Sequence, residues 1–469
     1  MLKRFQLKFF PLLVGTIFFA LVLQACGGGT PNNGNGNGPI NNGNGNGPTT
    51  ITVAYQQFGP PPYPDADWWT QVKQQFEASN PNVKIKLEPI IADEGGYYTQ
   101  VELMMSSAST APDIVREDSF LVASDATAGY LAPLESYLTQ WSEYQQQWFP
   151  TMQQIPTFNG HNYGLMNGTD TRLIWYNKDI FQKAGLPTDW QPNNWADILT
   201  AARTIKAKVP GVIPMNLYSG IPMNEASTMQ GFEMLLYGTY DPLYNYNTKK
   251  WVVSSKGFQD ALDFVRQVYN PSGLLGPSND IALSTQAANT VSQQLLPQGK
   301  LGIAIDGSWL PGNWASTGAA PSPQWQTTLG MAKMPTQFGQ DPKFVTLSGG
   351  WAHSITAQSQ HKDLAFQILK LAYSKDLLAD YDVKAAQIAP RKDIVGLAAY
   401  KSLPGNDFFS SLVAFTQFRP GFPAYPKISV QIGSAMQQVM SGKSSTDAMA
   451  AYAQAVVGIV GANNIERRI

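Results

Sequence analysis

The sequence predicts an α/β protein with two units of alternating strands and helices. Short β-branched runs alternate with stretches whose apolar residues recur at helical spacing, the pattern of strands joined by amphipathic helices. This alternation begins at residue 51 and starts again at residue 172. The chain has 469 residues, of which 43% are hydrophobic, so it carries enough apolar surface for large cores.

The first unit reads as strand, helix, strand, helix, strand. Strands are expected at residues 51–55, 83–87 and 112–115, and Asn80-Pro81 should end the helix between the first two. Asp67 is the expected N-cap of that helix. The apolar stripes of the two helices are Trp68, Val72 and Phe76, then Tyr97, Val101, Met104 and Ala108. Strands joined by helices in this way form a parallel sheet with right-handed crossovers.

The second unit repeats the pattern after residue 172. Strands are expected at residues 172–176, 212–217 and 301–305, and Gly185 should end a helix over residues 179–184. Two further helices carry apolar stripes, one with Trp195, Ile198, Leu199, Ala202 and Ile205, and one around residues 258–268. No obvious linker separates the two units, so the chain should form two lobes that face each other across a cleft.

The N-terminus has the parts of a secretory signal. A basic start precedes an apolar run over residues 9–23, and Ala25 stands directly before Cys26. The placement of Cys26 resembles the lipobox of bacterial lipoproteins, in which the cysteine is acylated. Residues 1–25 are therefore the expected signal peptide and Cys26 the expected palmitate attachment site. An ordinary cleaved signal with a chance cysteine is the alternative.

A Gly- and Asn-rich segment follows the cysteine. Residues 26–50 contain a near-duplicate of Pro31-Asn-Asn-Gly-Asn-Gly-Asn-Gly-Pro39, a composition that cannot bury a core. A flexible coil of this length spans about 27 Å, so the segment is the expected tether between the membrane and the folded body.

Composition excludes several classes of function. The 32 basic and 33 acidic residues give a net charge of −1, and charged residues are only 14% of the chain, so a nucleic-acid partner is not expected. One Cys and three scattered His exclude an internal disulfide and the usual zinc clusters, and we expect no metal or cofactor. No later stretch is apolar enough to span a bilayer, which predicts an exported, not embedded, chain.

Many short segments between residue 51 and about residue 455 match a known pattern in order. They include Ala111-Pro-Asp-Ile-Val115, Gly129-Tyr-Leu-Ala-Pro-Leu134, Asp170-Thr-Arg172, Tyr176-Asn-Lys-Asp-Ile-Phe181, Asp306-Gly-Ser-Trp309, Gly349-Gly-Trp351, Ala389-Pro-Arg391, Arg419-Pro420 and Ser441-Gly442. In this order they resemble the family 1 extracellular solute-binding proteins, the group that contains the maltose-binding proteins.

The resemblance implies a two-lobed periplasmic-binding-protein fold of type II, with interleaved lobes joined by hinge segments. The expected lobes are residues 51–168 plus 345–386 and residues 169–344 plus 387–469. It also implies a monomeric extracytoplasmic protein, lipid-anchored to the cell membrane, that captures a carbohydrate by hinge closure. The sugar would pass to the permease subunits of an ABC importer, and the protein would not be an enzyme.

Polar residues at strand ends are the first candidates for sugar contacts. Glu117, Asp118 and Ser119 follow the third expected strand at its carboxyl end, where ligands bind in such sheets; helix capping by Asp118 or Ser119 is the alternative. By resemblance, Asp170 and Arg172 line the cleft, and a structural ion pair at the strand entrance is their alternative.

Aromatic planes are the second kind of candidate, because the C–H face of a sugar ring stacks on them. Trp309 resembles the cleft tryptophan of the family, and Trp351 follows two glycines. Gln57, Asp65 and Glu225 are weaker candidates on bordering loops. The maltose-binding pattern has a tryptophan near the position of Ser429, so that contact is absent here or is replaced by Phe422 or Tyr425.

Two other functions share these features. A glycoside-acting enzyme also needs aromatic planes and two carboxyl groups, and the sequence does not exclude such a pair. A surface glycan-binding adhesin that takes no part in transport differs only in its partner.

Overall fold

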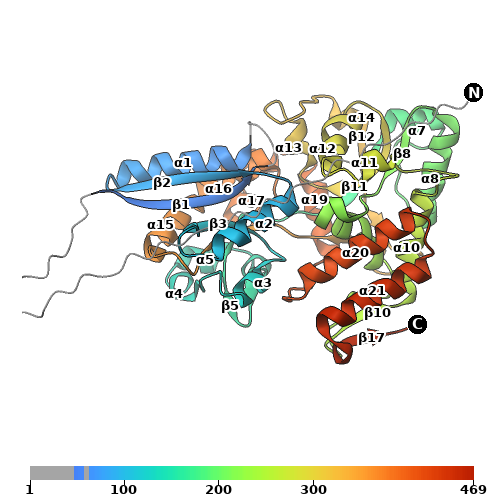
Figure 1. Ribbon diagram of the computed structural model, residues 1–469. Helices are drawn as coiled ribbons and strands as arrows, with labels where there is room; N and C mark the ends of the chain where they lie inside the picture. Colours follow the sequence, from blue (N-terminus) through green and yellow to red (C-terminus); the bar gives the residue numbers. More distant parts are fainter. Residues whose placement is uncertain (1–46, 58–62) are drawn as a thin grey trace, which may run out of the picture. The chain divides into compact units, whose positions relative to one another are not determined.

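The sheet nearest the N-terminus has the expected parallel centre. The computed structural model describes residues 47–57 and 63–469, and the body from Pro48 to Ile469 forms one unit (Figure 1). The expected signal peptide, Cys26 and nearly all of the tether lie outside the described residues. In the first sheet β1 pairs in parallel with both β2 and β3, which confirms the strand–helix–strand–helix–strand prediction.

Two antiparallel strands extend this first sheet. In spatial order its strands are β2 (Val83–Ile91), β1 (Thr49–Gln57), β3 (Ile114–Asp118), β15 (Trp351–Ile355) and β6 (Leu165–Met166). The antiparallel register of β15 and β3 sets Trp351 opposite Asp118. A residue from late in the chain thus lies beside the carboxyl end of an early strand.

The first helix starts earlier than the sequence predicts. Helix α1 (Pro64–Ser79) has Tyr63 at its N-cap, so the prediction that Asp67 caps it is wrong. Pro64 supplies the fixed φ that suits a first helical position, and Asp67 lies within the first turn, where its charge favours the helix dipole. The helix ends at Asn80 as predicted.

The second sheet is mixed. In spatial order its strands are β12 (Leu329–Ala332), β7 (Arg172–Asn177), β11 (Leu301–Gly307) and β8 (Ile213–Asn216). Strand β7 is antiparallel to both β11 and β12, and only β11 and β8 are parallel. Gly185, at φ 72°, ends helix α7 (Lys178–Ala184) as predicted, because glycine adopts this left-handed conformation without steric cost.

Helices and shorter strands complete the body. The longer helices are α2 (Glu94–Met105), α8 (Trp195–Lys208), α10 (Lys256–Val268), α15 (Lys362–Ala372), α16 (Lys375–Ala385), α20 (Tyr425–Met440) and α21 (Ser445–Val460). The shorter elements used below are α3 (Val122–Thr127), the π-helix η2 (Ala226–Glu233), α13 (Leu310–Trp314), α14 (Trp325–Thr328), β14 (Phe344–Leu347), α17 (Lys392–Val395), α18 (Ala398–Lys401), α19 (Asn406–Leu412) and β16 (Thr416–Gln417). The two C-terminal helices α20 and α21, red in Figure 1, pack side by side.

The chain passes between the two sheets more than once. Strand β14 pairs with β16 and contacts β7 of the second sheet, whereas β15, only a few residues later, belongs to the first sheet. Helices α17 and α18 contact α16, and their residues Ile394 and Tyr400 share a core with Trp69. The division into lobes stays a prediction, and these contacts favour crossings near residues 348–350 and beyond residue 403.

Three hydrophobic clusters hold the body together. The Trp69 core lies beneath the first sheet and also contains Trp68, Trp148, Phe366 and Tyr373. The Trp175 core belongs to the second sheet and also contains Leu173, Trp314, Trp325 and Phe409. The third and largest cluster joins residues of both sheets, such as Val115 and Ile305. Trp175, in the expected strand over residues 172–176, and Trp195, in an expected apolar stripe, are both buried.

Truncation of Trp175 tests the second core. Its ring contacts the rings of Trp314, Trp325 and Phe409, and its indole N–H donates to the Gly307 carbonyl at 3.1 Å. We expect Trp175→Ala to lower the free energy of unfolding by about 3–5 kcal/mol. Urea unfolding measures this change, with exposed Tyr240→Ala as the control that should alter stability by less than about 0.5 kcal/mol. Equal stability of the two variants would contradict the assignment.

Candidate functional site

A buried arginine joins acidic groups from distant parts of the chain. The Arg419 guanidinium donates to Asp118 at 2.5 Å, to the Ser119 hydroxyl at 3.2 Å and to Glu225 at 3.0 Å. It also lies over the Phe120 ring, 4.5 Å from the ring centroid. We call the following residues the arginine cluster: Tyr98, Asp118, Ser119, Glu225, Glu233, Arg419 and Tyr425.

Each member is held by a different element. Asp118 ends β3, Glu225 directly precedes η2, and Arg419 follows β16. Helix α3 begins at Val122 with Leu121 as its N-cap, so neither Asp118 nor Ser119 caps this helix. The carboxylate of Asp118 is instead available to Arg419 and to the hydroxyl of Tyr98, which donates to it at 2.9 Å.

Hydrogen bonds continue from Glu225 into the second unit. The Tyr425 hydroxyl lies 3.2 Å from Glu225 and 3.0 Å from Glu233. Burial and the charge of Glu225 raise the pKa of Glu233 to about 8. The Tyr425 hydroxyl is therefore placed to donate its single proton to either carboxyl group. It connects Glu233 to the rest of the arginine cluster.

Ser429 stands where the maltose-binding pattern has a tryptophan. Its hydroxyl donates to Glu225 and lies 2.9 Å from the Thr228 hydroxyl. Phe422 packs instead against Tyr244, with ring centroids 4.4 Å apart. Of the two replacements considered from sequence, only Tyr425 therefore joins the cluster.

A second ion pair lies beside the cluster. Arg172 donates to Asp170, which also accepts the backbone N–H of Gly349 at 2.9 Å. Gly349 lies between the two guanidinium groups: a Cβ there would come within 3.1 Å of Arg419 and 3.8 Å of Arg172. The structural ion pair considered from sequence is thus present, and it adjoins the cluster.

Trp309 is held over this second ion pair. The Arg172 guanidinium lies 4.9 Å from the centroid of the Trp309 ring. The ring also folds back over Gly307, where an added Cβ would come within 1.9 Å of it. Glycine is therefore required at 307 for this position of the ring, and part of Trp309 stays exposed.

Trp351 and Asp65 share a different arginine. The Arg116 guanidinium lies 4.0 Å from the centroid of the Trp351 ring and 3.4 Å from Asp65. Burial raises the pKa of Asp65, and the charge of Arg116 opposes this effect. Trp351 reaches the arginine cluster through Tyr98, whose ring centroid is 6.1 Å away.

The remaining candidates lie apart. Glu117 is 1% exposed, and its pKa is raised well above its ordinary value by burial and by the neighbouring Asp125. No described residue donates a hydrogen bond to either of its carboxyl oxygens. Gln57 is buried at the end of β1, beside Ile91 of β2.

Sequence reasoning missed several members of the cluster. Arg419, Tyr98 and Glu233 were not among the candidates, nor was Glu94, whose pKa is raised to about 8 by burial and the charges of Asp118 and Glu225. The available signal for Arg419 was its place in the Arg419-Pro420 pair of the resemblance. Tyr98 and Glu233 lie within helical segments and carried no such signal.

Metal chemistry and membrane spanning find no support in the described residues. Within residues 47–57 and 63–469, no group of three His, Cys, Asp or Glu side chains is arranged to hold a metal ion. Over the same ranges, every helix is too short or too polar to cross a bilayer.

The protonated state of Glu233 predicts a pH-dependent stability. Below a pH of about 4.5 the carboxyl is neutral in both the folded and the unfolded chain. Between that pH and about 8 only the unfolded chain loses the proton, so stability falls as pH rises, by roughly 3–5 kcal/mol in total. Glu233→Gln should remove this loss.

Thermal unfolding at pH 5 and pH 8 measures the effect. The melting temperature of Glu233→Gln relative to the unmodified protein should increase between the two pH values, whereas the exposed Asp407→Asn control should show no such increase. A constant difference for Glu233→Gln would contradict a neutral carboxyl at this position.

Known proteins share this fold over most of the chain. The solute-binding protein of Thermotoga lettingae TMO, solved with α-D-tagatose, superimposes with a TM-score of 0.75 at 24% identity and covers 88% of this chain and 100% of its own. A binding protein of Brucella abortus is 25% identical over 386 residues, or 81% of this chain and 87% of the relative. The diacetylchitobiose-binding protein DasA of Streptomyces coelicolor is 24% identical over 445 residues, or 93% of this chain and 94% of that protein.

The two-lobed type II fold expected from sequence is confirmed by this structural likeness. The family model described as bacterial extracellular solute-binding protein matches residues 61–379, more than half of the chain. The expected family is also confirmed: this chain belongs to the bacterial extracellular solute-binding proteins.

Proposed function

We propose that the protein binds a carbohydrate between its two lobes, at the arginine cluster, and passes it unchanged to the permease of an ABC importer. The observation that carries this proposal is Arg419, which bonds to Asp118 on the first sheet and to Glu225 beside the second. A ligand that replaces one of these bonds must contact both lobes, and binding then favours their closure.

The chemistry of the cluster suits sugar hydroxyls. Each hydroxyl donates and accepts, so carboxyl oxygens such as those of Asp118 and Glu225 accept its hydrogen bond while Arg419 donates to its oxygen. Protonated Glu94 and Glu233 add further donors at neutral pH. Charges of both signs lie close together, which favours a neutral ligand over an anionic one.

The partly exposed rings of Trp309 and Trp351 supply the apolar part of the site. Arg172 and Arg116 hold these rings from one side each, which leaves less side-chain freedom to lose on binding. The tagatose and diacetylchitobiose named for two similar proteins are the kind of ligand that such rings accept.

The proposal extends to the N-terminus and to assembly. Residues 1–25 act as a signal peptide, Cys26 carries the acyl chains, and the segment that follows holds the monomeric body near the permease. The lobes begin with residues 51–168 and 169–344, as expected from the sequence, and the contacts described above favour later crossings near residues 348–350 and beyond residue 403.

A sugar panel tests the carbohydrate ligand. We expect at least one of α-D-tagatose, maltose and diacetylchitobiose to raise the melting temperature, because a ligand at ~100 times its Kd adds roughly 2.7 kcal/mol of stability. Calorimetry with that sugar should then show binding weakened by about 1–3 kcal/mol in Trp309→Ala and in Trp351→Ala. The matched control is Trp195→Phe, since no described residue accepts a bond from the buried Trp195 indole N–H.

Unchanged affinity in both alanine variants would remove the two tryptophans from the site. Cleavage of the sugar during the titration would contradict a binding protein and favour the glycoside-acting alternative.

Membrane attachment has its own test. Cys26→Ser removes the thiol that would be acylated, so the variant should appear in the soluble fraction while the unmodified protein sediments with membranes. Fractionation and immunoblotting measure this distribution. Retention of the serine variant on membranes would contradict the acyl anchor.

A further inference from the structure

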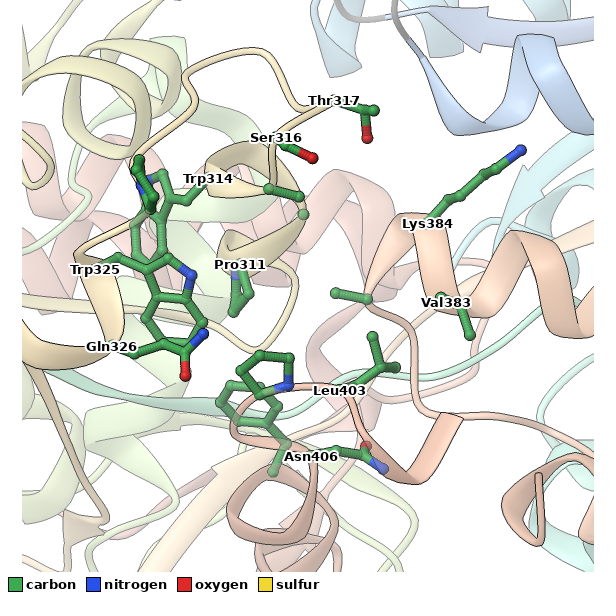
Figure 2. A pocket seen from close by; sticks show the side chains of 16 residues that line it. Pro311, Trp314, Ser316, Thr317, Trp325, Gln326, Val383, Lys384, Leu403 and Asn406 are labelled. Carbon is green, nitrogen blue, oxygen red and sulfur yellow. The ribbon is translucent and has the colours of Figure 1, made fainter. Parts of the chain in front are cut away.

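A cavity of about 380 Å³ lies outside the arginine cluster. It is lined by parts of α13, the loop that follows it, α14, the end of α16 and the start of α19, and Figure 2 shows these side chains around it. No member of the arginine cluster lines it. Its volume falls within the range of about 300–1,000 Å³ that is usual for small-molecule sites.

Two different cores supply its walls. Trp314, Trp325 and Phe409 belong to the Trp175 core, and the rings of Trp314 and Trp325 lie 5.5 Å apart. On the other side, Val383 and Leu403 pack against the Trp69 core. The walls are therefore fixed by packing on both sides and do not depend on a loop alone.

Among the described residues that line the cavity, the charged side chain is already paired. Lys384 is the ionisable residue of its lining, and its ammonium pairs with Asp380 at 2.9 Å and with Asp67 at 3.5 Å. Figure 2 shows the Lys384 side chain extending away from the other lining residues. An ionic ligand would find no unpaired partner here, so the occupant should be neutral.

Uncharged polar groups border the cavity, and several exposed ones make no hydrogen bond to another described residue. Among the described residues, the side chains of Ser316, Thr317 and Gln326 make no hydrogen bond, and the Trp325 indole N–H has no acceptor. Asn406, nine-tenths buried, donates weakly to the Tyr400 carbonyl at 3.4 Å, which leaves its amide oxygen as an acceptor. Figure 2 shows the amides of Gln326 and Asn406 along one side and the hydroxyls of Ser316 and Thr317 along another.

Apolar surface separates these polar groups. The lining also includes the aliphatic residues Pro311, Pro323, Pro404 and Ala386. A molecule that fits must combine C–H faces with hydroxyl groups that both donate and accept. Cyclic polyols have this combination at this size.

We propose that this cavity is a second binding site, for a neutral, hydroxyl-rich molecule the size of a monosaccharide. Its walls join the Trp69 and Trp175 cores, and its hydrogen bonds come from uncharged groups. It is separate from the site proposed at the arginine cluster, where buried charges do the bonding.

Binding of D-glucose tests whether the cavity accepts such a molecule, and a tryptophan introduced at its exposed wall should prevent this binding. Ser316→Trp fills the cavity from an exposed loop position, and Ala319→Trp places the same ring at an exposed position of that loop outside the lining. We expect NMR titration of D-glucose to show affinity at least about tenfold lower in Ser316→Trp than in Ala319→Trp. Gln326→Ala should weaken binding several-fold.

Asp118→Asn separates this inference from the proposed function. We expect it to weaken the panel sugar at the arginine cluster and to leave D-glucose binding unchanged. Loss of D-glucose binding in Asp118→Asn would overturn the second site, as would equal affinity in the two tryptophan variants or no binding at all. Unchanged affinity of Asp118→Asn for the panel sugar would overturn the proposed function alone.

Discussion

The site depends on one buried cation shared between two carboxylates. Arg419 is held by Asp118, which ends β3, and by Glu225, which precedes η2 and lies more than a hundred residues later in sequence. Removal of water from these charges is costly, and only their mutual pairing offsets the cost. In the proposed function, a ligand that supplies hydroxyls at these positions replaces part of this pairing when it binds.

Local pattern predicted part of the fold. The strand–helix alternation from residue 51 gave the parallel centre of the first sheet, since β1, α1, β2, α2 and β3 follow the period of their apolar residues. It did not give the antiparallel strand β15, because nothing near Trp351 in sequence records that its partner is Asp118. The helix start was also misplaced, since Pro64 determines it and not the better capping residue Asp67.

The candidate site was predicted in part, and for a definite physical reason. Asp118, Glu225 and Tyr425 were named singly, but the sequence holds no record of the residue that connects them. Arg419 lies in a short irregular segment after β16. In such a segment neither the period of apolar residues nor motif spacing predicts which way a side chain points. Glu117, by contrast, was a candidate that does not join the cluster. Successive side chains of a strand point to opposite faces, so Glu117 lies on the other face of β3 from Asp118, near Asp125.

The pairing of charges within the site also affects the rate at which a sugar reaches it. Arg419 and Arg172 are each bonded to carboxylates, and Glu94 and Glu233, whose pKa values are raised to about 8 by burial, are neutral at pH 7. Little net field then extends from the site into solvent, and a sugar without charge would not respond to one. The rate at which the protein meets a sugar is then set by diffusion and by the fit of their shapes. A protein exposed outside the cell can thereby capture its ligand at the same rate in dilute and in saline surroundings.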